Sequence, residues 1–212
     1  MTIPMPPMHD TLRRHAGLTL LGVVLLISGC SDPYQWKTSN VTGKFPDLEF
    51  KLTSEQNKTV TEEDFTGTVN LLFFGYTSCP DVCPMTLSRL SAVMDELKPR
   101  ERRQLRILFV SVDPGRDSPA RLRDYTDAFG PRVIGATADK ATLKDFTSRY
   151  FMTFSYGETD EDGNYDVRHN GSVLAFDRQG NARLKIAASS VGGTPSDSVD
   201  AIVADLRALL SE

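Results

Sequence analysis

The chain has 212 residues and a formal net charge of -4 at pH 7. This length is enough for one domain with a hydrophobic core, and the mildly acidic charge argues against a nucleic-acid partner. Three cysteines are too few for a disulfide scaffold.

The first thirty residues have the pattern of an export signal. Arg13 and Arg14 precede a short apolar run, Leu18–Ile27, and small residues lead from it to Cys30. This order is typical of a secretory signal peptide, and the run is too short to span a membrane comfortably. The residues from Leu26 to Cys30 also resemble a bacterial lipobox, which implies cleavage before Cys30 and lipidation of its thiol. The alternative is an uncleaved anchor with an incidental cysteine.

Three segments follow from this pattern. Residues 1–29 are expected to form a lipoprotein signal peptide, residues 30–40 a lipidated flexible tether, and residues 41–212 the folded domain. The tether is expected because Ser31–Asn40 is polar and has no hydrophobic periodicity. The predicted location is the bacterial cell envelope, with the domain in the periplasm or otherwise outside the cytoplasmic membrane and held to a membrane by the lipid.

Short elements are expected at the start of the folded domain. Apolar residues between Val41 and Val60 indicate one or two short strands. Thr61 can cap a single helical turn that reaches Phe65. These elements would form an N-terminal extension of the central sheet.

The stretch Val69–Met85 contains two cysteines at the end of a predicted strand. The apolar run Val69–Tyr76 is rich in aromatic residues and is closed by turn residues, which favours a buried strand. Apolar residues then recur at helical spacing up to Leu97. Cys79 and Cys83 therefore lie where a central strand passes into a helix. Prolines at positions 80 and 84 limit where a regular helix can begin, so we expect a stiff loop around the two cysteines.

The position of the cysteines has chemical consequences. Free backbone N–H groups and the positive end of a helix dipole favour a thiolate over a thiol. If the turn is helix-like, Cys79 and Cys83 lie on one face, about 6 Å apart along the axis. A disulfide and a shared metal ion are both within reach of this spacing. In an oxidising compartment such a pair tends to be one or the other.

Strands and helices alternate through the rest of the chain. Asp117 or Ser118 can cap the helix that begins at Pro119, and Asp162-Gly163 is a hairpin-turn signal ahead of His169. The predicted elements are a strand at Arg106–Val112, a helix from Pro119, a strand at Val133–Ala136, a helix at Asp139–Tyr150, an extended segment at Phe151–Tyr156, strands at Gly171–Phe176 and Ala182–Ile186, and a C-terminal helix at about Ser196–Leu210.

The order of these elements indicates the fold class. Alternating strands and helices, followed by a terminal hairpin and helix, predict an α/β fold with a mixed central sheet flanked by helices. A cysteine pair directly after the first central strand is the arrangement of thioredoxin-like domains, although their usual spacing is CxxC and this chain has CxxxC. We therefore expect a thioredoxin-like fold.

Three features of the sequence resemble one known family. They are Cys79-Pro-Asp-Val-Cys83-Pro84, the segment Ser111–Pro119 with the sequence SVDPGRDSP, and the late His169. Together they resemble the SCO/SenC proteins over about residues 40–210. The resemblance implies a membrane-anchored copper chaperone of thioredoxin-like fold, which assists assembly of the binuclear copper centre of cytochrome c oxidase. It implies the copper-bearing subunit of the oxidase as a partner and, as a further candidate, another periplasmic copper chaperone.

The resemblance also implies the metal ligands. Cys79, Cys83 and His169 would bind one copper ion per chain, as Cu(I), Cu(II) or both. Two thiolates and an imidazole form a soft set that suits Cu(I), and an added water or oxygen ligand allows Cu(II). Family members commonly have Asp before the histidine and Ser or Thr after it, whereas this chain has Arg168-His169-Asn170. This departure removes no ligand, but it affects the groups that tune the site.

Other functions stay open for the cysteine pair. Thiol–disulfide oxidoreduction on the oxidase subunit or on other exported proteins needs no histidine, because one cysteine attacks and the other resolves. A thiol peroxidase is disfavoured, since Gly-Tyr-Thr-Ser precedes Cys79 in place of the usual Pro-x-x-x-Thr-x-x-Cys context. A structural disulfide would close a tiny loop and stabilise little, and a closed zinc site would want a fourth protein ligand. As a copper chaperone the protein would not be an enzyme.

Overall fold

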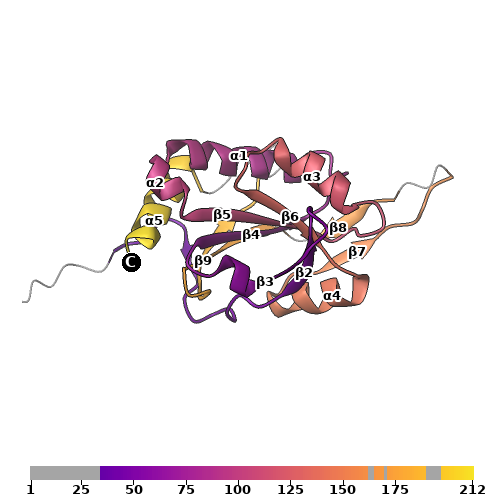
Figure 1. The fold of residues 1–212 in the computed structure, drawn as a ribbon, viewed down its shortest axis with the longest axis horizontal. Coiled ribbons are helices and arrows are strands. Elements are labelled where there is room, and N and C mark those ends of the chain that lie inside the picture. Colours follow the sequence, from indigo (N-terminus) through magenta and orange to yellow (C-terminus); the bar gives the residue numbers. More distant parts are fainter. Residues whose placement is uncertain (1–33, 162–164, 170, 190–196) are drawn as a thin grey trace, which may run out of the picture. The chain divides into compact units, whose positions relative to one another are not determined.

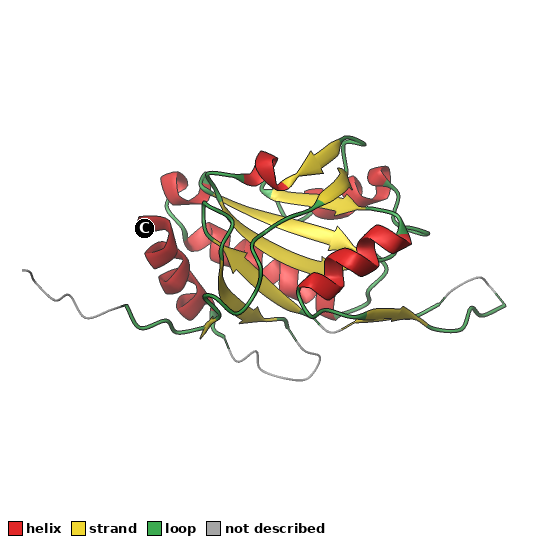
Figure 2. Cartoon of the chain, turned by 90° about the horizontal axis from the view of Figure 1, so that it is seen from below, coloured by secondary structure: helices red, strands yellow, loops and turns green. Residues whose placement is uncertain are grey.

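A mixed sheet of eight strands forms the centre of the protein, as Figures 1 and 2 show. The computed structural model describes residues 34–161, 165–169, 171–189 and 197–212. β4, β5 and β6 run parallel to one another, whereas the other neighbours in the sheet are antiparallel. In sheet order the strands are β1 (Ser39–Asn40), β10 (Ala182–Ala187), β9 (Ser172–Phe176), β4 (Val69–Gly75), β5 (Leu105–Ser111), β6 (Val133–Thr137), β2 (Lys51–Ser54) and β3 (Thr59–Thr61).

Helices cover both faces of this sheet. On one face Leu87, Leu122 and Ile202 are buried together, which places α1, α3 and α5 over the same core layer. On the other face Phe65 and Phe146 share a second core layer, under η1 and α4. The helices are α1 (Val82–Glu96), α2 (Pro99–Arg102), α3 (Pro119–Asp127), α4 (Lys140–Arg149) and α5 (Val199–Ser211), and η1 (Glu62–Phe65) is a 3-10 turn.

The central strand β4 is buried along its whole length. Leu71 and Phe73 belong to the first core layer, whereas Leu72 and Phe74 belong to the second. Successive side chains of a strand point to opposite faces of the sheet. Because helices cover both faces here, every residue of β4 is buried, and most of them are apolar. The continuous apolar run in the sequence has this origin. The predicted α/β architecture with a mixed central sheet is confirmed.

A separate two-stranded sheet follows α4. It consists of β7 (Phe154–Tyr156) and β8 (Val167–His169), which pair antiparallel with Phe154 opposite His169. Val167 is buried and shares the second core layer with Tyr76, the residue directly after β4. The hairpin therefore packs against the end of the central strand. The turn signal Asp162-Gly163 lies outside the described residues.

One local prediction near the cysteines differs from the structure, and one is confirmed. α1 begins at Val82, so Cys83 lies in its first turn and the stiff loop is shorter than expected. Pro84 is compatible with this start, because backbone N–H groups in the first turn have no acceptor inside the helix. At α3 the cap is Ser118, one of the two predicted candidates, which accepts a hydrogen bond from the Arg121 backbone. Asp117 makes other contacts.

The folded domain also begins earlier than predicted. Gln35–Glu212 forms one compact unit, so residues 35–40 belong to the domain and not to the predicted tether. Buried Asp205 of α5 accepts hydrogen bonds from the backbone of Lys37 and Thr38, and Ser39 pairs with β10. The predicted signal peptide and Cys30 lie outside the described residues. None of the described helices combines the length and apolar character needed to cross a bilayer.

Candidate metal and thiol site

The structure brings the two cysteines together at the junction of β4 and α1. Cys79 lies in the turn after β4 and is half-buried, whereas Cys83 in the first turn of α1 is fully buried. The backbone N–H of Cys83 donates a hydrogen bond to the sulfur of Cys79 over 3.4 Å. The side chain of Asp81, at the cap position of α1, makes no capping hydrogen bond. The sulfur of Cys79 therefore accepts a bond from a helix N–H group that a capping side chain would otherwise take.

The thiol of Cys83 is tightly enclosed. A Cβ atom placed on Gly75 would lie 2.8 Å from the sulfur of Cys83 and 2.6 Å from the ring of Phe109, so only glycine fits beside this thiol. A hydrogen bond with Cys79 and burial raise the pKa of the Cys83 thiol. Cys83 is consequently protonated at neutral pH, and metal binding or oxidation must displace its proton.

Tyr76 lies between the cysteines and the hairpin. Burial, the charges of Cys79 and Cys83 and a hydrogen bond with the side chain of Cys79 together raise its pKa to about 12, although a bond from the backbone of Val167 acts in the lowering direction. The Tyr76 hydroxyl therefore contacts both half-buried Cys79 and β8. In the sequence Tyr76 is recognisable only as the end of an apolar run, because this bridge joins positions that are far apart in the chain.

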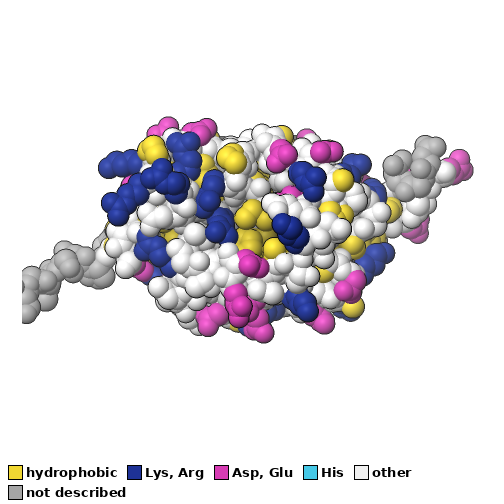
Figure 3. Space-filling model, viewed as in Figure 1, with side chains coloured by type: hydrophobic (Ala, Val, Ile, Leu, Met, Phe, Trp, Pro, Cys, Tyr) yellow, Lys and Arg dark blue, Asp and Glu magenta, His cyan; other side chains and the backbone are white. Residues whose placement is uncertain are grey.

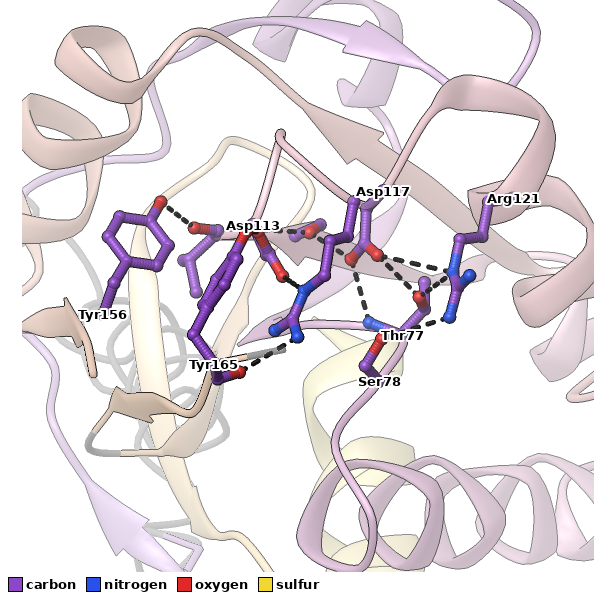
Figure 4. A network of polar contacts seen from close by, with 10 residues as sticks. Thr77, Ser78, Asp113, Asp117, Arg121, Tyr156 and Tyr165 are labelled. Carbon is purple, nitrogen blue, oxygen red and sulfur yellow. Dashed lines mark hydrogen bonds and ion pairs between the residues drawn. The ribbon is translucent and has the colours of Figure 1, made fainter. Parts of the chain in front are cut away.

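A buried carboxylate holds the segment that leads to Cys79. Asp117 accepts a hydrogen bond from the backbone N–H of Thr77 over 2.9 Å and one from its hydroxyl over 2.6 Å. The hydroxyl of Ser111 donates to the same carboxylate over 2.5 Å, and Arg121 donates to the Thr77 hydroxyl over 2.7 Å. Figure 4 shows Asp117 and Arg121 directed at Thr77, with Ser78 beside it. Asp117, one of the two predicted cap candidates beside Ser118, fixes the entry to the cysteine turn.

The histidine is placed only by its backbone. His169 is the last residue of β8, and its side chain lies outside what the structure describes. Among the side chains that are described, no three His, Cys, Asp or Glu residues form a metal cluster. The structure thus places Cys79 and Cys83 side by side. Tyr76, which contacts both Cys79 and Val167, brings β8 next to them. The imidazole of His169 and the predicted lipidation site Cys30 lie outside the described parts of the structure.

A hollow lies beside the cysteine turn. It has a volume of about 690 Å³ and mixed charge, with one arginine from the segment after β5, one from α3, and acidic residues from the hairpin. Its lining residues include Ser78, Pro80, Arg116, Tyr165 and Asp166. Figure 3 shows how basic and acidic side chains are distributed over one face of the molecule. The mixed lining offers no surface of a single charge to a ligand.

Known proteins are similar to this chain in sequence and in fold. The family model described as SCO1/SenC matches residues 41–209. Among curated relatives, the human protein named "Protein SCO1 homolog, mitochondrial" is 33% identical over 150 residues, which cover 66% of this chain and 50% of the relative. The chain spans between about half and just under two thirds of the length of the first curated relatives that it matches.

Solved structures agree with this match. The crystal structure of Arabidopsis thaliana ScoI with copper bound has a TM-score of 0.66 at 29% identity, covering 76% of this chain and 98% of that one. The solution structure of apo Sco1 from Thermus thermophilus has a TM-score of 0.68 at 29% identity, covering 82% and 98%. The shared mixed sheet flanked by helices confirms the predicted thioredoxin-like fold. Since the family model matches most of its length, the chain belongs to the SCO1/SenC family.

Proposed function

We propose that this protein is a membrane-tethered copper chaperone that binds one copper ion through Cys79, Cys83 and His169. The observation that carries the proposal is the pair of adjacent thiols at the start of α1, one half-buried and one buried. Two sulfurs and an imidazole are soft ligands that suit Cu(I), and they can also hold Cu(II) if an oxygen ligand joins them. Copper is here the cargo of the protein.

The relatives support copper as that cargo. ScoI proteins of Arabidopsis thaliana and Bradyrhizobium japonicum have been solved with copper bound, and a relative from Stutzerimonas stutzeri is named a putative copper-binding protein. The half-exposed sulfur of Cys79 suits a donor of metal, because an incoming ligand can reach the ion there and take it by exchange. Family membership supports the binuclear copper centre of cytochrome c oxidase as the destination, with the copper-bearing subunit as partner and another periplasmic copper chaperone as a candidate supplier.

We further propose that lipidated Cys30 holds the domain to a membrane of the bacterial envelope. Cleavage would remove residues 1–29, and residues 30–34 would then link the lipid to the domain that begins at Gln35. A SCO1/SenC family lipoprotein from Bacillus anthracis has the same fold. The sequence pattern around Cys30 supports this assignment, and mass spectrometry of the mature N-terminus tests it.

A second function is thiol–disulfide oxidoreduction. The chemical difference between Cys79 and Cys83 favours it, because one sulfur is reachable and the other lies directly behind it, as attack and resolution require. The two activities are compatible, since the cysteines of an oxidase subunit must be reduced before they accept copper.

Copper titration separates these functions. The full chain in detergent, reduced without oxygen, is titrated with Cu(I) against a competing chelator, in parallel with Cys79→Ser and His169→Ala. We expect one copper per chain, loss of tight binding without Cys79, and weaker binding without His169. Met85→Leu is the matched control, because Met85 is an exposed soft side chain in the first turn of α1 and should not contribute.

Two results would contradict the three-ligand site. Absence of tight copper binding in the unmodified chain would remove the chaperone assignment and leave the reduction potential of the cysteine pair as the property to measure. Binding that is indifferent to His169→Ala would remove the histidine from the ligand set.

A further inference from the structure

Besides the packing of Val167, tyrosine side chains attach the small sheet that carries His169 to the domain. Among the described strands, β7 and β8 form no ladder with the eight-stranded sheet. The hydroxyl of Tyr165, two residues before β8, donates to the carboxylate of Asp113 over 2.6 Å. The hydroxyl of Tyr156 in β7 donates to the carbonyl of Val112 over 2.7 Å. Figure 4 shows both tyrosines directed at the segment that follows β5.

Arg116 completes this attachment. Its Nε donates to Asp113 over 2.5 Å, and its Nη1 donates to the backbone carbonyl of Tyr165 over 2.9 Å. The guanidinium also lies 3.9 Å from the centre of the Tyr165 ring. Asp113 is fully buried, and its two oxygens are divided between Arg116 and the Tyr165 hydroxyl. Charge-assisted bonds of this kind are stronger than neutral ones, so the three residues form a firm contact.

The same turn holds the cysteine segment. Asp117, four residues after Asp113, fixes the backbone and hydroxyl of Thr77, which lies two residues before Cys79. The backbone N–H of Asp117 donates to the carbonyl of Asp113 over 2.9 Å. The two carboxylates are therefore fixed in one short turn, and each faces a segment that carries a proposed ligand.

We propose that Arg116 is a positioning residue for the metal site, which fixes β8 and thereby sets where His169 meets the Cys79–Cys83 pair. This inference rests on the proposed function, specifically on His169 as a ligand. Arginine suits the task because its planar guanidinium donates in two directions and stacks on a ring at the same time. A lysine would keep the charge but lose the fork and the stacking plane.

A double-mutant cycle tests this role. Cu(I) affinity is measured on the full chain in detergent for the unmodified protein, Arg116→Lys, His169→Ala and the double variant. We expect Arg116→Lys to weaken binding about tenfold or more, the effect that losing a residue which orients a metal ligand commonly has. In the His169→Ala background it should cause no further loss, because residues that act through one another are not additive.

Two further variants sharpen the test. Arg123→Lys is the matched control, since Arg123 donates to the backbone carbonyl of Glu55 over 2.6 Å, outside the hairpin, and its affinity should not change. Tyr165→Phe removes only the hydroxyl bond to Asp113 and should cause a smaller loss that also disappears without His169. In the Cu(II) complex, the nitrogen hyperfine signal of the imidazole should weaken in Arg116→Lys and persist in the control.

The outcomes distinguish the two claims. Equal losses with and without His169 would show that Arg116 acts on the fold alone and would overturn the positioning role. An unchanged affinity and an unchanged hyperfine signal in Arg116→Lys would overturn it as well. If His169→Ala itself leaves the affinity unchanged, the ligand assignment under the proposed function fails instead.

Discussion

The backbone N–H of Cys83 donates a hydrogen bond to the sulfur of Cys79 across 3.4 Å. The sulfur of Cys79 thus lies at the N-terminus of α1, where the helix dipole favours negative charge. Cys83 is in the opposite situation, because its hydrogen bond with Cys79 and its burial raise its pKa. The two cysteines of one motif are therefore in different environments: Cys79 is half-buried and its sulfur accepts a helix N–H, whereas Cys83 is buried and its pKa is raised.

This difference predicts the order of alkylation. In the reduced, metal-free full chain at neutral pH, iodoacetamide should modify Cys79 well before Cys83, because only a thiolate that reagent can reach reacts quickly. Fragment mass spectrometry of the peptide that contains both residues measures the order. The denatured chain is the control, since both cysteines should then react at similar rates. Preferential modification of Cys83 in the folded chain would contradict the assignment.

A second prediction concerns the space around Cys83. Gly75→Ala introduces a Cβ atom that meets Phe109 and Cys83 at less than van der Waals distance. Overpacking of a core costs about 1–3 kcal/mol, and denaturant unfolding should report a loss of this size. Gly157→Ala is the matched control, because the neighbours of its new Cβ lie at ordinary contact distances. Equal stability of the two variants would mean that the cysteine turn moves aside freely.

A third prediction concerns the carboxylate that holds Thr77. Asp117→Asn retains the shape of the side chain but turns one acceptor oxygen into a donor, which then faces groups that themselves donate, from Thr77 and Ser111. An unsatisfied buried polar group costs about 1–3 kcal/mol, and the free energy of unfolding should fall accordingly. Asp124→Asn, an exposed change on α3, should have almost no effect. A similar small effect at both positions would show that Asp117 is not needed to hold the turn.

The sequence was sufficient for the parts of the site that are local in the chain. β4 was predictable because a strand covered on both faces must be apolar at successive positions, as Leu71, Leu72, Phe73 and Phe74 are. The position of the cysteines between β4 and α1 followed from the change of hydrophobic period. The start of α1 was predicted too late, because proline was taken as a barrier where the first helical turn tolerates it.

Contacts between distant positions could not be predicted in the same way. Asp113 and Tyr165 are 52 residues apart, and no periodicity links a loop carboxylate to a tyrosine hydroxyl. The backbone N–H of Thr38 donates a hydrogen bond to Asp205, which lies 167 residues later in the chain. Residues 35–40 are polar and were therefore predicted as part of a tether, although this contact places them in the domain. Buried polar groups of this kind are determined by tertiary packing, and composition alone gives no sign of their partners.

The last prediction follows from the titration of Tyr165. Burial and the hydrogen bond and charge of Asp113 raise its pKa to about 12, from an ordinary value of 10. Below pH 10 the hydroxyl is protonated in the folded and the unfolded chain, so its bond to Asp113 contributes fully. Between pH 10 and 12 the unfolded chain loses this proton first and binds fewer protons than the folded chain, so the free energy of unfolding falls as pH rises.

The comparison of Tyr165→Phe with the unmodified chain isolates this contribution. Denaturant unfolding of both proteins between pH 8 and 12 should show the unmodified chain as the more stable one up to about pH 10, with the difference shrinking above that value. The other tyrosines titrate in both proteins and cancel in the comparison. Tyr156→Phe is the comparison variant, because the Tyr156 hydroxyl donates to a backbone carbonyl that carries no charge. Burial and then the charge of Asp113 also raise the pKa of Tyr156, so its stability difference should shrink over the same pH range, but by less than that of Tyr165→Phe. A stability difference for Tyr165→Phe that stays constant from pH 8 to 12 would show that its hydroxyl does not hold the hairpin through Asp113.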